Sequence, residues 1–372
     1  MRLVIVTHKV VHGDGQGRVN LEIVRAALAR GSHVTVVASA VEPGLREHAQ
    51  LSWLPIPVAG WPSQLLRNQV FALRSARKLR RMRAGADVML ANGFITWVAA
   101  DVNVVHMVHG AWLRKPAYLF RRWWQSPYAA YQRAYASLNA RLERRAFAQA
   151  RCVVAVSEKT AGELLEIGVP VQKIVTIQNG VDTEEFHPGP GDRARWRLPA
   201  STPLFLFAGD LRTRSKGLDT VLRALALTPQ GHLAVAGALR DSPLPSLATR
   251  LGISDRVHWL GFERDMPTLL RTVDAFVFPS RYESAGLVIL EAMASGVPVL
   301  TARTAGGAEI LGAGGRVLED PEDVTTLARW MAELASDPDL RRRMGSAGRE
   351  IAEAHTWAQM ATAYLELIES LA

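Results

Sequence analysis

Short hydrophobic runs alternate with longer amphipathic stretches along the whole chain of 372 residues. Runs of Val, Ile and Leu with helical patterns between them are typical of parallel strands that helices cover on both faces. We therefore predict an α/β protein with doubly wound sheets. The predicted strands are LVIVT, HVTVVA, DVMLA, NVVHMV, CVVAV and KIVTI in the first half, and PLFLFAG, HLAVAG, RVHWLG, AFVFP and PVLTA in the second.

Two such series in one chain predict two domains, and the chain length suits this division. The hydrophobic pattern lapses over residues 182–203, where Pro and Gly cluster. We expect residues 1–186 to form the first Rossmann-like domain and residues 187–356 the second. Ligands of open α/β sheets bind at the carboxyl ends of the strands, so the crevice between the two domains is the expected site.

The hydrophobic pattern also indicates in which compartment of the cell the protein is found. Residues 86–108 are hydrophobic overall, but four polar residues interrupt them, Asp87, Asn92, Asp101 and Asn103. This predicts two buried strands and a helix there, not a membrane span. The first apolar run is too short for a signal peptide. The single cysteine, Cys152, lies in the run RCVVAV and is expected to be a buried structural thiol in a cytoplasmic protein.

The net charge of +9 is unevenly distributed. Residues 1–188 carry 24 Lys and Arg against 13 Asp and Glu, whereas the remainder carries 20 against 22. Residues 61–83 and 112–141 contain no acid and mix cations with aromatic rings, which is typical of helices at an anionic membrane surface. A solvated face is the alternative, and no nucleic-acid partner is expected because no such module is recognisable. The residues concerned are Arg67, Arg74, Arg77, Lys78, Arg80, Arg81, Arg83, Trp112, Arg114, Lys115, Tyr118, Phe120, Arg121, Arg122, Trp123 and Trp124.

The stretch RYESAGLVILEAMASG, residues 281–296, is apolar on nearly every side after Gly286, which predicts a buried helix. Glu291 lies inside it, and a buried carboxylate needs a partner or loses its charge. With Ser284 as the N-cap, the first N–H groups of this helix would form an anion site. Those groups belong to Ala285, Gly286 and Leu287. Glu291 would then bind a ribose and Glu283 a sugar, and a structural hydrogen-bond acceptor is the alternative role for Glu291.

Two further segments suggest a phosphate ligand. LFLFAGDLRTRSKGLDTVL leaves a predicted strand at Gly209 and places three cations, Arg212, Arg214 and Lys216, before a helix. Cations beside a helix N-terminus suit a diphosphate, with a solvated basic loop as the alternative. THKVVHGDGQGRVNLEIV places Gly15 and Gly17 between a strand and a helix. Its spacing is not G-x-G-x-x-G, so the dinucleotide interpretation is weak, and a tight turn is the alternative to a ligand loop.

Several of these segments together resemble a known enzyme family. ESAGLVILEAMASGVPV looks like the E-x7-E signature of the family 4 retaining glycosyltransferases, which have the GT-B fold. Further similarities run in the same order over nearly the whole chain, in VSEKTAGELLEIGVPVQKIVTIQNGVDTEEFHP, GDLRTRSKGLDTVL, HLAVAG, VHWLGF and TAGGAEIL. The resemblance implies two Rossmann-like domains facing each other across a cleft, and a C-terminal helix, residues 357–372, that crosses back to the first domain.

The resemblance also implies roles for the second domain's residues. Glu291 would bind the nucleotide ribose, and Glu283 the hydroxyls of the donor sugar. Lys216 and an arginine would neutralise the diphosphate. Family members often read G-R-L where this chain has a central Asp210. We therefore assign the arginine's role to Arg212, with Arg214 as the alternative.

In the first domain, the resemblance places Gly15 and Gly17 beside the donor phosphate and the acceptor. It also places a histidine near the donor sugar, for which His109 fits better than His106, which is expected to pack in the sheet. H-x-x-H can look like a metal pair. Residues three apart on a strand point to opposite faces, however, and no third ligand is evident, so no metal site is predicted.

The only D-x-D sequence, Asp337-Pro338-Asp339, is predicted to cap a surface helix. Without a metal site among the phosphate ligands, we expect metal-independent catalysis and no cofactor. The resemblance implies a retaining glycosyltransferase that acts by front-face substitution. It would move a sugar from a nucleotide-diphosphate donor to a membrane-associated glycan or glycolipid, at the inner face of the cell membrane. The alternatives are a nucleotide-sugar epimerase of the same fold, a non-catalytic glycan- or nucleotide-sugar-binding protein, and a nucleic-acid-binding protein.

Overall fold

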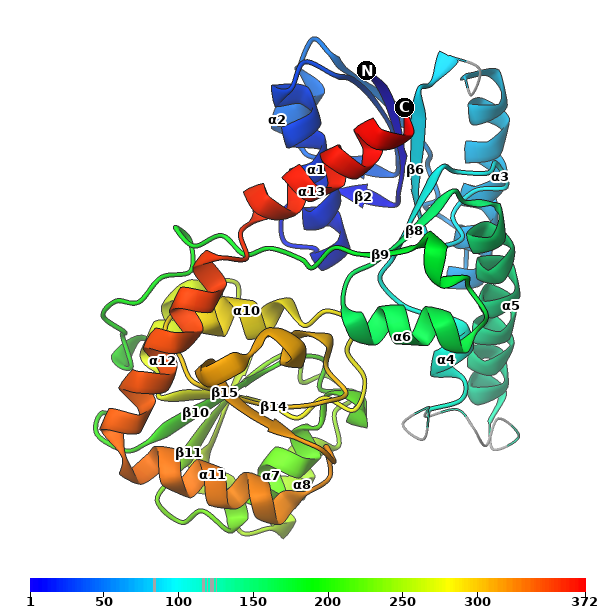
Figure 1. Ribbon diagram of the computed structural model, residues 1–372. Coiled ribbons are helices and arrows are strands. Elements are labelled where there is room, and N and C mark those ends of the chain that lie inside the picture. Colours follow the sequence, from blue (N-terminus) through cyan, green and yellow to red (C-terminus); the bar gives the residue numbers. More distant parts are fainter. Residues whose placement is uncertain (83–84, 116–117, 119, 121–123, 125) are drawn as a thin grey trace. The chain divides into compact units, whose positions relative to one another are not determined.

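The computed structural model describes residues 1–82, 85–115, 118, 120, 124 and 126–372. These residues form two compact units, Met1–Asn179 with Trp357–Ala372, and Gly180–Thr356. Each unit contains its own parallel sheet (Figure 1). The predicted α/β class with two doubly wound sheets is therefore confirmed.

The first unit contains a parallel sheet of seven strands in the order β5-β3-β1-β6-β7-β8-β9. Its strands are β1 (Arg2–Val6), β3 (His33–Ala38), β5 (Leu51–Pro55), β6 (Val88–Asn92), β7 (Val102–Val105), β8 (Cys152–Ala155) and β9 (Ile174–Thr176), and β2 (Lys9–Val10) pairs with β4 (Ala40–Val41). Its helices are α1 (Gly15–Ala29), α2 (Pro43–Arg46), α3 (Gln64–Met82), α4 (His109–Trp112), α5 (Pro127–Gln149), α6 (Glu158–Glu166) and α13 (Trp357–Leu371). The C-terminal helix α13 packs against α1 and so belongs to this unit.

The second unit contains a parallel sheet of six strands in the order β12-β11-β10-β13-β14-β15. Its strands are β10 (Leu204–Ala208), β11 (His232–Ala236), β12 (Val257–Gly261), β13 (Ala275–Phe278), β14 (Val299–Ala302) and β15 (Gly315–Leu318). Its helices are α7 (Leu218–Ala226), α8 (Leu244–Arg250), α9 (Met266–Thr272), α10 (Leu287–Ala294), α11 (Val324–Ser336) and α12 (Pro338–Glu353). Helix α10 packs with α12, and α7 packs with α8 and α11. The buried Leu, Val and Phe residues of β10 and β13 form the centre of its core.

The division between the units follows Asn179, earlier than the boundary expected after residue 186. The backbone of Val181 explains the difference, because its N–H donates to the carbonyl of His355 at 2.9 Å. Arg349 also donates to the carbonyls of Thr183 and Phe186. Hydrogen bonds to α12 and to the residues that follow it therefore hold residues 181–186 within that unit.

The β6–β7 connection differs from the sequence prediction. The two strands form as expected, but residues 93–101 contain no helix. Gly93 begins the segment with φ of +59°, and the β-branched Ile95, Thr96 and Val98 follow. Both features disfavour a helix in so short a connection. Within the described ranges, no helix has the length and hydropathy needed to cross a bilayer.

Candidate active site

The sheet order of the second unit places β10 and β13 side by side, although their chain connections lead to opposite edges of the sheet. This arrangement is the topological switch point, where ligands bind outside the carboxyl ends of the strands. The loop after β10, residues 209–217, carries Arg212, Arg214 and Lys216. The loop after β13, residues 279–286, carries Glu283. The structure therefore brings these predicted residues to one end of one sheet.

Lys216 and Glu283 meet directly at this switch point. Lys216 Nζ lies 2.5 Å from Glu283 Oε2, and each side chain is 24% exposed. The loop after β14 also contacts Glu283, since the N–H of Gly306 donates to the carbonyl of Glu283 at 2.9 Å. A cation and a carboxylate in contact and still open to solvent can each exchange this partner for a ligand group. Their contact is the main geometric feature of the candidate site.

Gly217 allows the two loops to approach this closely. It precedes α7 with φ of +80°, and a Cβ atom there would lie 2.1 Å from the carbonyl oxygen of Pro279. Any larger residue would meet both backbone strain and a clash with the main chain. The position of Lys216, one residue earlier, therefore depends on this glycine.

A buried ion pair behind the site was not predicted from the sequence. Arg281 is 8% exposed and donates to both carboxylate oxygens of Asp219, at 2.7 and 3.1 Å. It also donates to the carbonyl of Arg214 and to Glu322 Oε1. Burial raises the pKa of Asp219, but hydrogen bonds from Arg281 and Arg214 outweigh it and lower that pKa below its ordinary value. Arg281 thereby ties the loop of Lys216 to the loop of Glu283.

Arg212 is held within its own loop. Its Nε and Nη2 donate to the two carboxylate oxygens of Asp210, at 2.9 and 3.1 Å, and its backbone N–H donates to Oδ1 at 3.0 Å. The side-chain bonds from Arg212 lower the pKa of Asp210. Arg214 instead contacts Asp219. The aspartate that replaces the family's arginine therefore partly neutralises the cation that we assigned to the diphosphate.

The start of α10 differs from the prediction. Gly286, not Ser284, is the N-cap, with φ of +79° and ψ of +55°. Ser284 is buried, and its backbone N–H donates to Glu283 Oε1 at 3.2 Å. A glycine in the left-handed conformation turns the chain abruptly into the helix, so no serine side chain caps it. The first N–H groups of α10 have no partners one turn earlier within the helix, as at any helix N-terminus.

Glu291 is partly exposed, which corrects the prediction that it is deeply buried. Leu287 and Val288 are also partly exposed, whereas Ile289, Leu290 and Ala292 are buried. Residues 287, 288 and 291 share one face because a helix turns once in 3.6 residues. The composition of α10 is apolar all round, but this face is open and carries the carboxylate.

In the first unit, the glycine-rich segment forms the start of α1. The helix begins at Gly15, and Asp14 is its N-cap, whose Oδ1 accepts from the N–H of Gly17 at 2.8 Å. Asp14 Oδ2 also lies 3.0 Å from Lys9 Nζ. Gly17 is buried, and a Cβ atom there would lie 3.1 Å from the carbonyl oxygen of Val11. Asp14 was not singled out from the sequence, although a residue of its type before a helix is a typical cap.

His109 is the first residue of α4 and contacts Glu143 of α5. Its Nδ1 lies 2.5 Å from Glu143 Oε1, and its backbone N–H donates to Oε2 at 3.0 Å. Because a carboxylate only accepts, Nδ1 carries a proton in this contact. Glu143 is 4% exposed. It was not identified from the sequence, where it is 34 residues away from His109. His106 follows β7 beside Asn92, and burial lowers its pKa to about 4.

Other predictions concern capping, the thiol and metals. Asp337 caps α12 as predicted, accepting from the N–H of Leu340 at 2.8 Å. Cys152 is buried, and burial raises the pKa of its thiol. Among the described residues, no three His, Cys, Asp or Glu side chains converge as a metal site would require.

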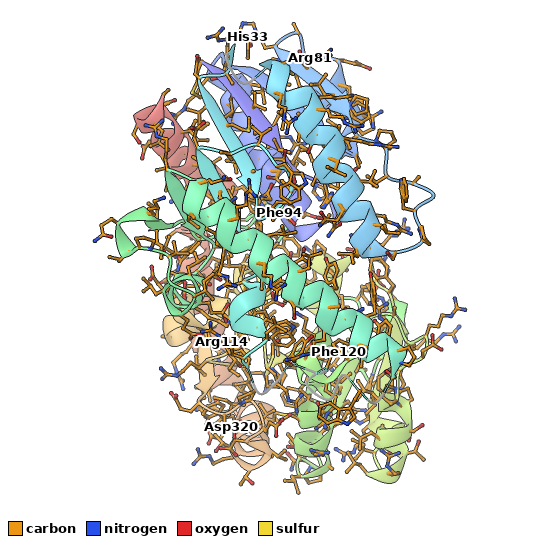
Figure 2. All side chains as sticks on the ribbon, turned by 90° about the vertical axis from the view of Figure 1, so that its right-hand side faces the viewer. His33, Arg81, Phe94, Arg114, Phe120 and Asp320 are labelled. Atoms are coloured by element: carbon orange, nitrogen blue, oxygen red, sulfur yellow. The ribbon has the colours of Figure 1, made fainter. Side chains whose placement is uncertain are left out.

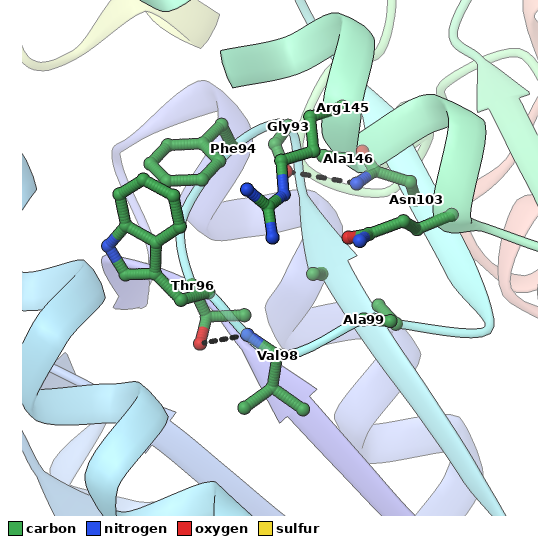
Figure 3. Close-up of a pocket in the computed structure, with 12 residues that line it drawn as sticks. Gly93, Phe94, Thr96, Val98, Ala99, Asn103, Arg145 and Ala146 are labelled. Atoms are coloured by element: carbon green, nitrogen blue, oxygen red, sulfur yellow. Dashed lines mark hydrogen bonds between the residues drawn. The ribbon is translucent and has the colours of Figure 1, made fainter.

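A small pocket lies elsewhere in the first unit, between the β6–β7 connection and α5 (Figure 3). Arg145 and Phe94 line it, and Asn103 Nδ2 donates to the carbonyl of Gly93 at 3.0 Å. The Arg145 guanidinium lies 5.5 Å from the centre of the Trp97 ring. None of the residues predicted for the donor site lies in this pocket.

The acid-free stretches include all of α3 and the first part of α5. Helix α3 carries Arg67, Arg74, Arg77, Lys78, Arg80 and Arg81. Arg114 and Lys115 follow α4 and contact Glu166. Four members of the predicted basic and aromatic set, Arg83, Arg121, Arg122 and Trp123, lie outside the described residues.

Two family models match the chain in succession. Residues 13–185 match the model described as Glycosyltransferase Family 4, and residues 190–351 match the model described as Glycosyl transferases group 1. The MMP alpha-(1->4)-mannosyltransferase of Mycolicibacterium hassiacum is 28% identical over 326 residues, which cover 83% of this chain and 76% of that protein. The lipopolysaccharide core biosynthesis glycosyltransferase LpsE of Rhizobium meliloti is 35% identical over 183 residues. The match covers 48% of this chain and 53% of that protein, so the chain spans about half the length of this relative.

Solved structures also resemble the chain. The crystal structure of Anabaena Alr3699/HepE in complex with UDP and glucose has a TM-score of 0.74 at 20% sequence identity, and the match covers 100% of both chains. At this identity the likeness shows a shared fold. Both sheets of the chain and the helices around them are included in the match.

Proposed function

Since this chain belongs to the family 4 glycosyltransferases and has the GT-B fold, we propose that it transfers a sugar from a nucleotide-diphosphate donor to an acceptor hydroxyl with retention of anomeric configuration. The contact between Lys216 and Glu283 at the switch point carries this proposal. In this contact a cation and a carboxylate lie where an open α/β sheet binds a ligand, and a carboxylate can accept hydrogen bonds from sugar hydroxyls. The complex of HepE with UDP and glucose supports a donor of this class.

Each predicted residue has a role in the proposal. Lys216 exchanges Glu283 for a phosphate oxygen, and Glu283 then accepts hydrogen bonds from the hydroxyls of the sugar. Arg212 adds a second cation when it leaves Asp210. The N–H groups at the start of α10 bind a phosphate, and Glu291 accepts the two ribose hydroxyls one turn further along the helix.

The first unit would supply the remaining contacts. Gly15 and Gly17, in the first turn of α1, let the backbone approach the donor phosphate and the acceptor. His109 contributes Nε2 near the donor sugar, while Glu143 holds its Nδ1. These roles come from the family resemblance, and the geometry of each residue within its own unit is compatible with them.

The proposed reaction is a front-face substitution. The acceptor oxygen forms a bond to the anomeric carbon while the bond from that carbon to the phosphate oxygen breaks. The proton of the acceptor hydroxyl passes to the leaving phosphate oxygen, on the same face of the sugar. Lys216, Arg212 and the N-terminus of α10 stabilise the negative charge of the departing diphosphate without a metal ion.

The acceptor is proposed to be a membrane-associated glycan, such as a lipopolysaccharide core or a lipid-linked chain. The cationic and aromatic stretches of the first unit support this class of acceptor. The Rhizobium relative is a glycosyltransferase of lipopolysaccharide core biosynthesis, which agrees with it. The enzyme would then work at the cytoplasmic face of the membrane.

Lys216→Ala and Glu283→Gln test the site. Each should lower sugar transfer at least about a hundredfold, since each removes a contact that strengthens in the transition state. The measurement is transfer of labelled sugar, from a panel of nucleotide sugars, to a glycolipid fraction, with the anomeric form of the product determined by NMR.

Glu350→Gln, an exposed position on α12, is the matched control and should keep full activity. Thermal unfolding should show that all three variants remain folded. Full transfer by both site variants would contradict the assignment. Release of an epimerised nucleotide sugar without any acceptor would favour the epimerase alternative.

A further inference from the structure

Helix α3 has an unusual solvent-exposed face. Leu66 is 41% exposed and Leu73 is 51% exposed, and the two lie two helical turns apart on the same side. Val70, between them, is partly exposed. The buried side of the helix instead packs Phe71 and Leu79 on the first sheet. The apolar stripe that faces solvent is therefore separate from the core.

The same helix ends in an uncompensated cluster of cations. Arg77, Arg80 and Arg81 are exposed, and no acidic partner is found for any of them within the part of the chain that the structure describes. Three other cations of α3 donate to backbone carbonyls, Arg67 to Trp61, Arg74 to Pro57 and Lys78 to Pro55. Those bonds fix one edge of the helix and leave its positive charge unchanged.

Helix α5 lies beside α3. Its Tyr131 and Tyr135 hydroxyls accept hydrogen bonds from Leu65 and Asn68 of α3, at 3.2 and 3.0 Å. Figures 1 and 2 show the two helices side by side, with Arg81 at the far end of α3 and Phe94 between the helices. Helix α5 contains one acidic residue, Glu143, which is buried and forms a hydrogen bond with His109. The combined face of α3 and α5 therefore presents cations without exposed carboxylates.

We propose that the face of α3 and α5 binds a bilayer of anionic phospholipids. Arg77, Arg80 and Arg81 would bind the phosphate headgroups, and Leu66 and Leu73 would enter the boundary of the acyl chains. Leu73 and Arg80, seven residues apart, lie on the same exposed side of α3. Leucines and arginines that share one exposed helix face can contact acyl chains and phosphate headgroups together. A nucleic acid would use the charge but would leave the leucine stripe without a role. This inference rests on the proposed function, because binding to the membrane would bring the enzyme to a membrane-borne acceptor.

Vesicle flotation tests the proposal. The full-length protein should float with vesicles of phosphatidylglycerol and phosphatidylcholine, and should not float with phosphatidylcholine alone. The triple variant R77Q/R80Q/R81Q should bind about a hundredfold more weakly, since each cation near such a surface contributes about fivefold. The control R250Q/R329Q/R343Q removes the same charge from exposed positions of the second unit and should float like the wild type.

The apolar stripe is tested separately. L66S/L73S should lower binding about tenfold because it removes the residues that enter the acyl boundary. The control L165S/L227S changes two leucines of similar exposure, 48% and 60%, at other helices and should have no effect. Circular dichroism should show that all four variants are folded.

Two outcomes would overturn the proposal. The first is flotation of R77Q/R80Q/R81Q at the wild-type level. The second is wild-type protein that does not bind the anionic vesicles at physiological salt but binds a single-stranded oligonucleotide. Thermal shifts with nucleoside diphosphates report on the donor site independently. Loss of those shifts with intact flotation would defeat the proposed function alone, and the reverse result would defeat this inference alone.

Discussion

Asp210 gives the loop after β10, residues 209–217, a property that the family resemblance does not imply. Members of the family often carry an arginine at this position, whereas here an aspartate binds the nearby Arg212 through three hydrogen bonds. Its carboxylate also lies close enough to Lys216 for that cation to contribute to the lowered pKa of Asp210. A diphosphate that enters the loop must compete with this carboxylate for Arg212.

Asp210→Asn should therefore strengthen nucleoside diphosphate binding. The amide keeps an oxygen for the Arg212 N–H but removes the competing charge. Because exposed ion pairs contribute about 0.2–1 kcal/mol, we expect about a two- to fivefold gain in affinity by isothermal titration calorimetry. Asp255→Asn, at an exposed turn of the second unit, is the control and should leave affinity unchanged. Weaker binding by Asp210→Asn would show that the carboxylate supports the ligand instead of competing with it.

The site residues that the sequence indicated are those with local signals. Lys216 and Glu283 follow predicted strands, so their place at the carboxyl ends of the sheet could be inferred. The contacts of Arg281 with Asp219 and of His109 with Glu143 join residues 62 and 34 positions apart, and no local pattern marks such pairs. Arg281 lies two residues before Glu283 in the same loop, but only the fold shows that it is buried against the start of α7.

Helix α10 shows what the composition of a single element leaves undetermined. Its residues are apolar on nearly every side, which predicted complete burial and a special need for a partner at Glu291. The structure leaves the face of Leu287, Val288 and Glu291 partly open. Exposure depends on which neighbours cover a helix, and its own sequence does not contain that information. Residues 93–101 differ from the prediction for a local reason, because the positive φ of Gly93 and the β-branched residues after it disfavour a helix between the two correctly predicted strands.

The turn between η5 (Arg214–Lys216) and α7 depends on Gly217. Gly217→Ala should destabilise the protein by about 2 kcal/mol or more, since the new methyl group must avoid the carbonyl of Pro279 in addition to adopting a strained φ. It should also weaken nucleoside diphosphate binding by displacing Lys216. Chemical denaturation and calorimetry measure the two effects.

Gly252→Ala is a close control. Its φ of +69° imposes similar backbone strain, but no heavy atom lies within 4 Å of the added Cβ. We expect a loss of about 1 kcal/mol and normal ligand binding. Equal behaviour of the two variants would show that the approach of Pro279 to Gly217 does not constrain the loop.

For the molecule as a whole, the fold class was the most predictable property. Eleven hydrophobic runs predict strands, and every one of them overlaps a strand of one of the two sheets. The second sheet has the strand order expected for a doubly wound unit. Short edge strands such as β5 and β15 were not predicted, because their mixed polar sequences lack a continuous apolar run.

The first unit should make the protein sensitive to acid. Burial lowers the pKa values of His8 and His106 to about 4, from an ordinary value of 6.5. The unfolded chain therefore binds protons more readily than the folded one, so stability is fully present above pH 6.5 and falls as the pH drops from 6.5 toward 4. Each histidine contributes up to about 3 kcal/mol across this window.

The free energy of unfolding, measured by denaturant titration at several pH values, checks this expectation. The variant H8Q/H106Q should show a shallower loss of stability between pH 6.5 and about 4. His33→Gln, at an exposed position, should keep the wild-type profile. An unchanged pH profile in the double variant would assign the acid sensitivity to other groups.

The proposed function requires that the switch point of the second sheet bind a nucleotide-diphosphate sugar. Isothermal titration of the wild type and of Lys216→Ala and Glu291→Gln with a panel of nucleoside diphosphates and their sugars measures this binding. We predict one bound donor per chain, with at least about tenfold weaker binding in each variant and unchanged binding in the control Arg343→Ala. Failure of every compound to bind, or equal affinity of all four proteins for the same donor, would contradict the proposed donor site.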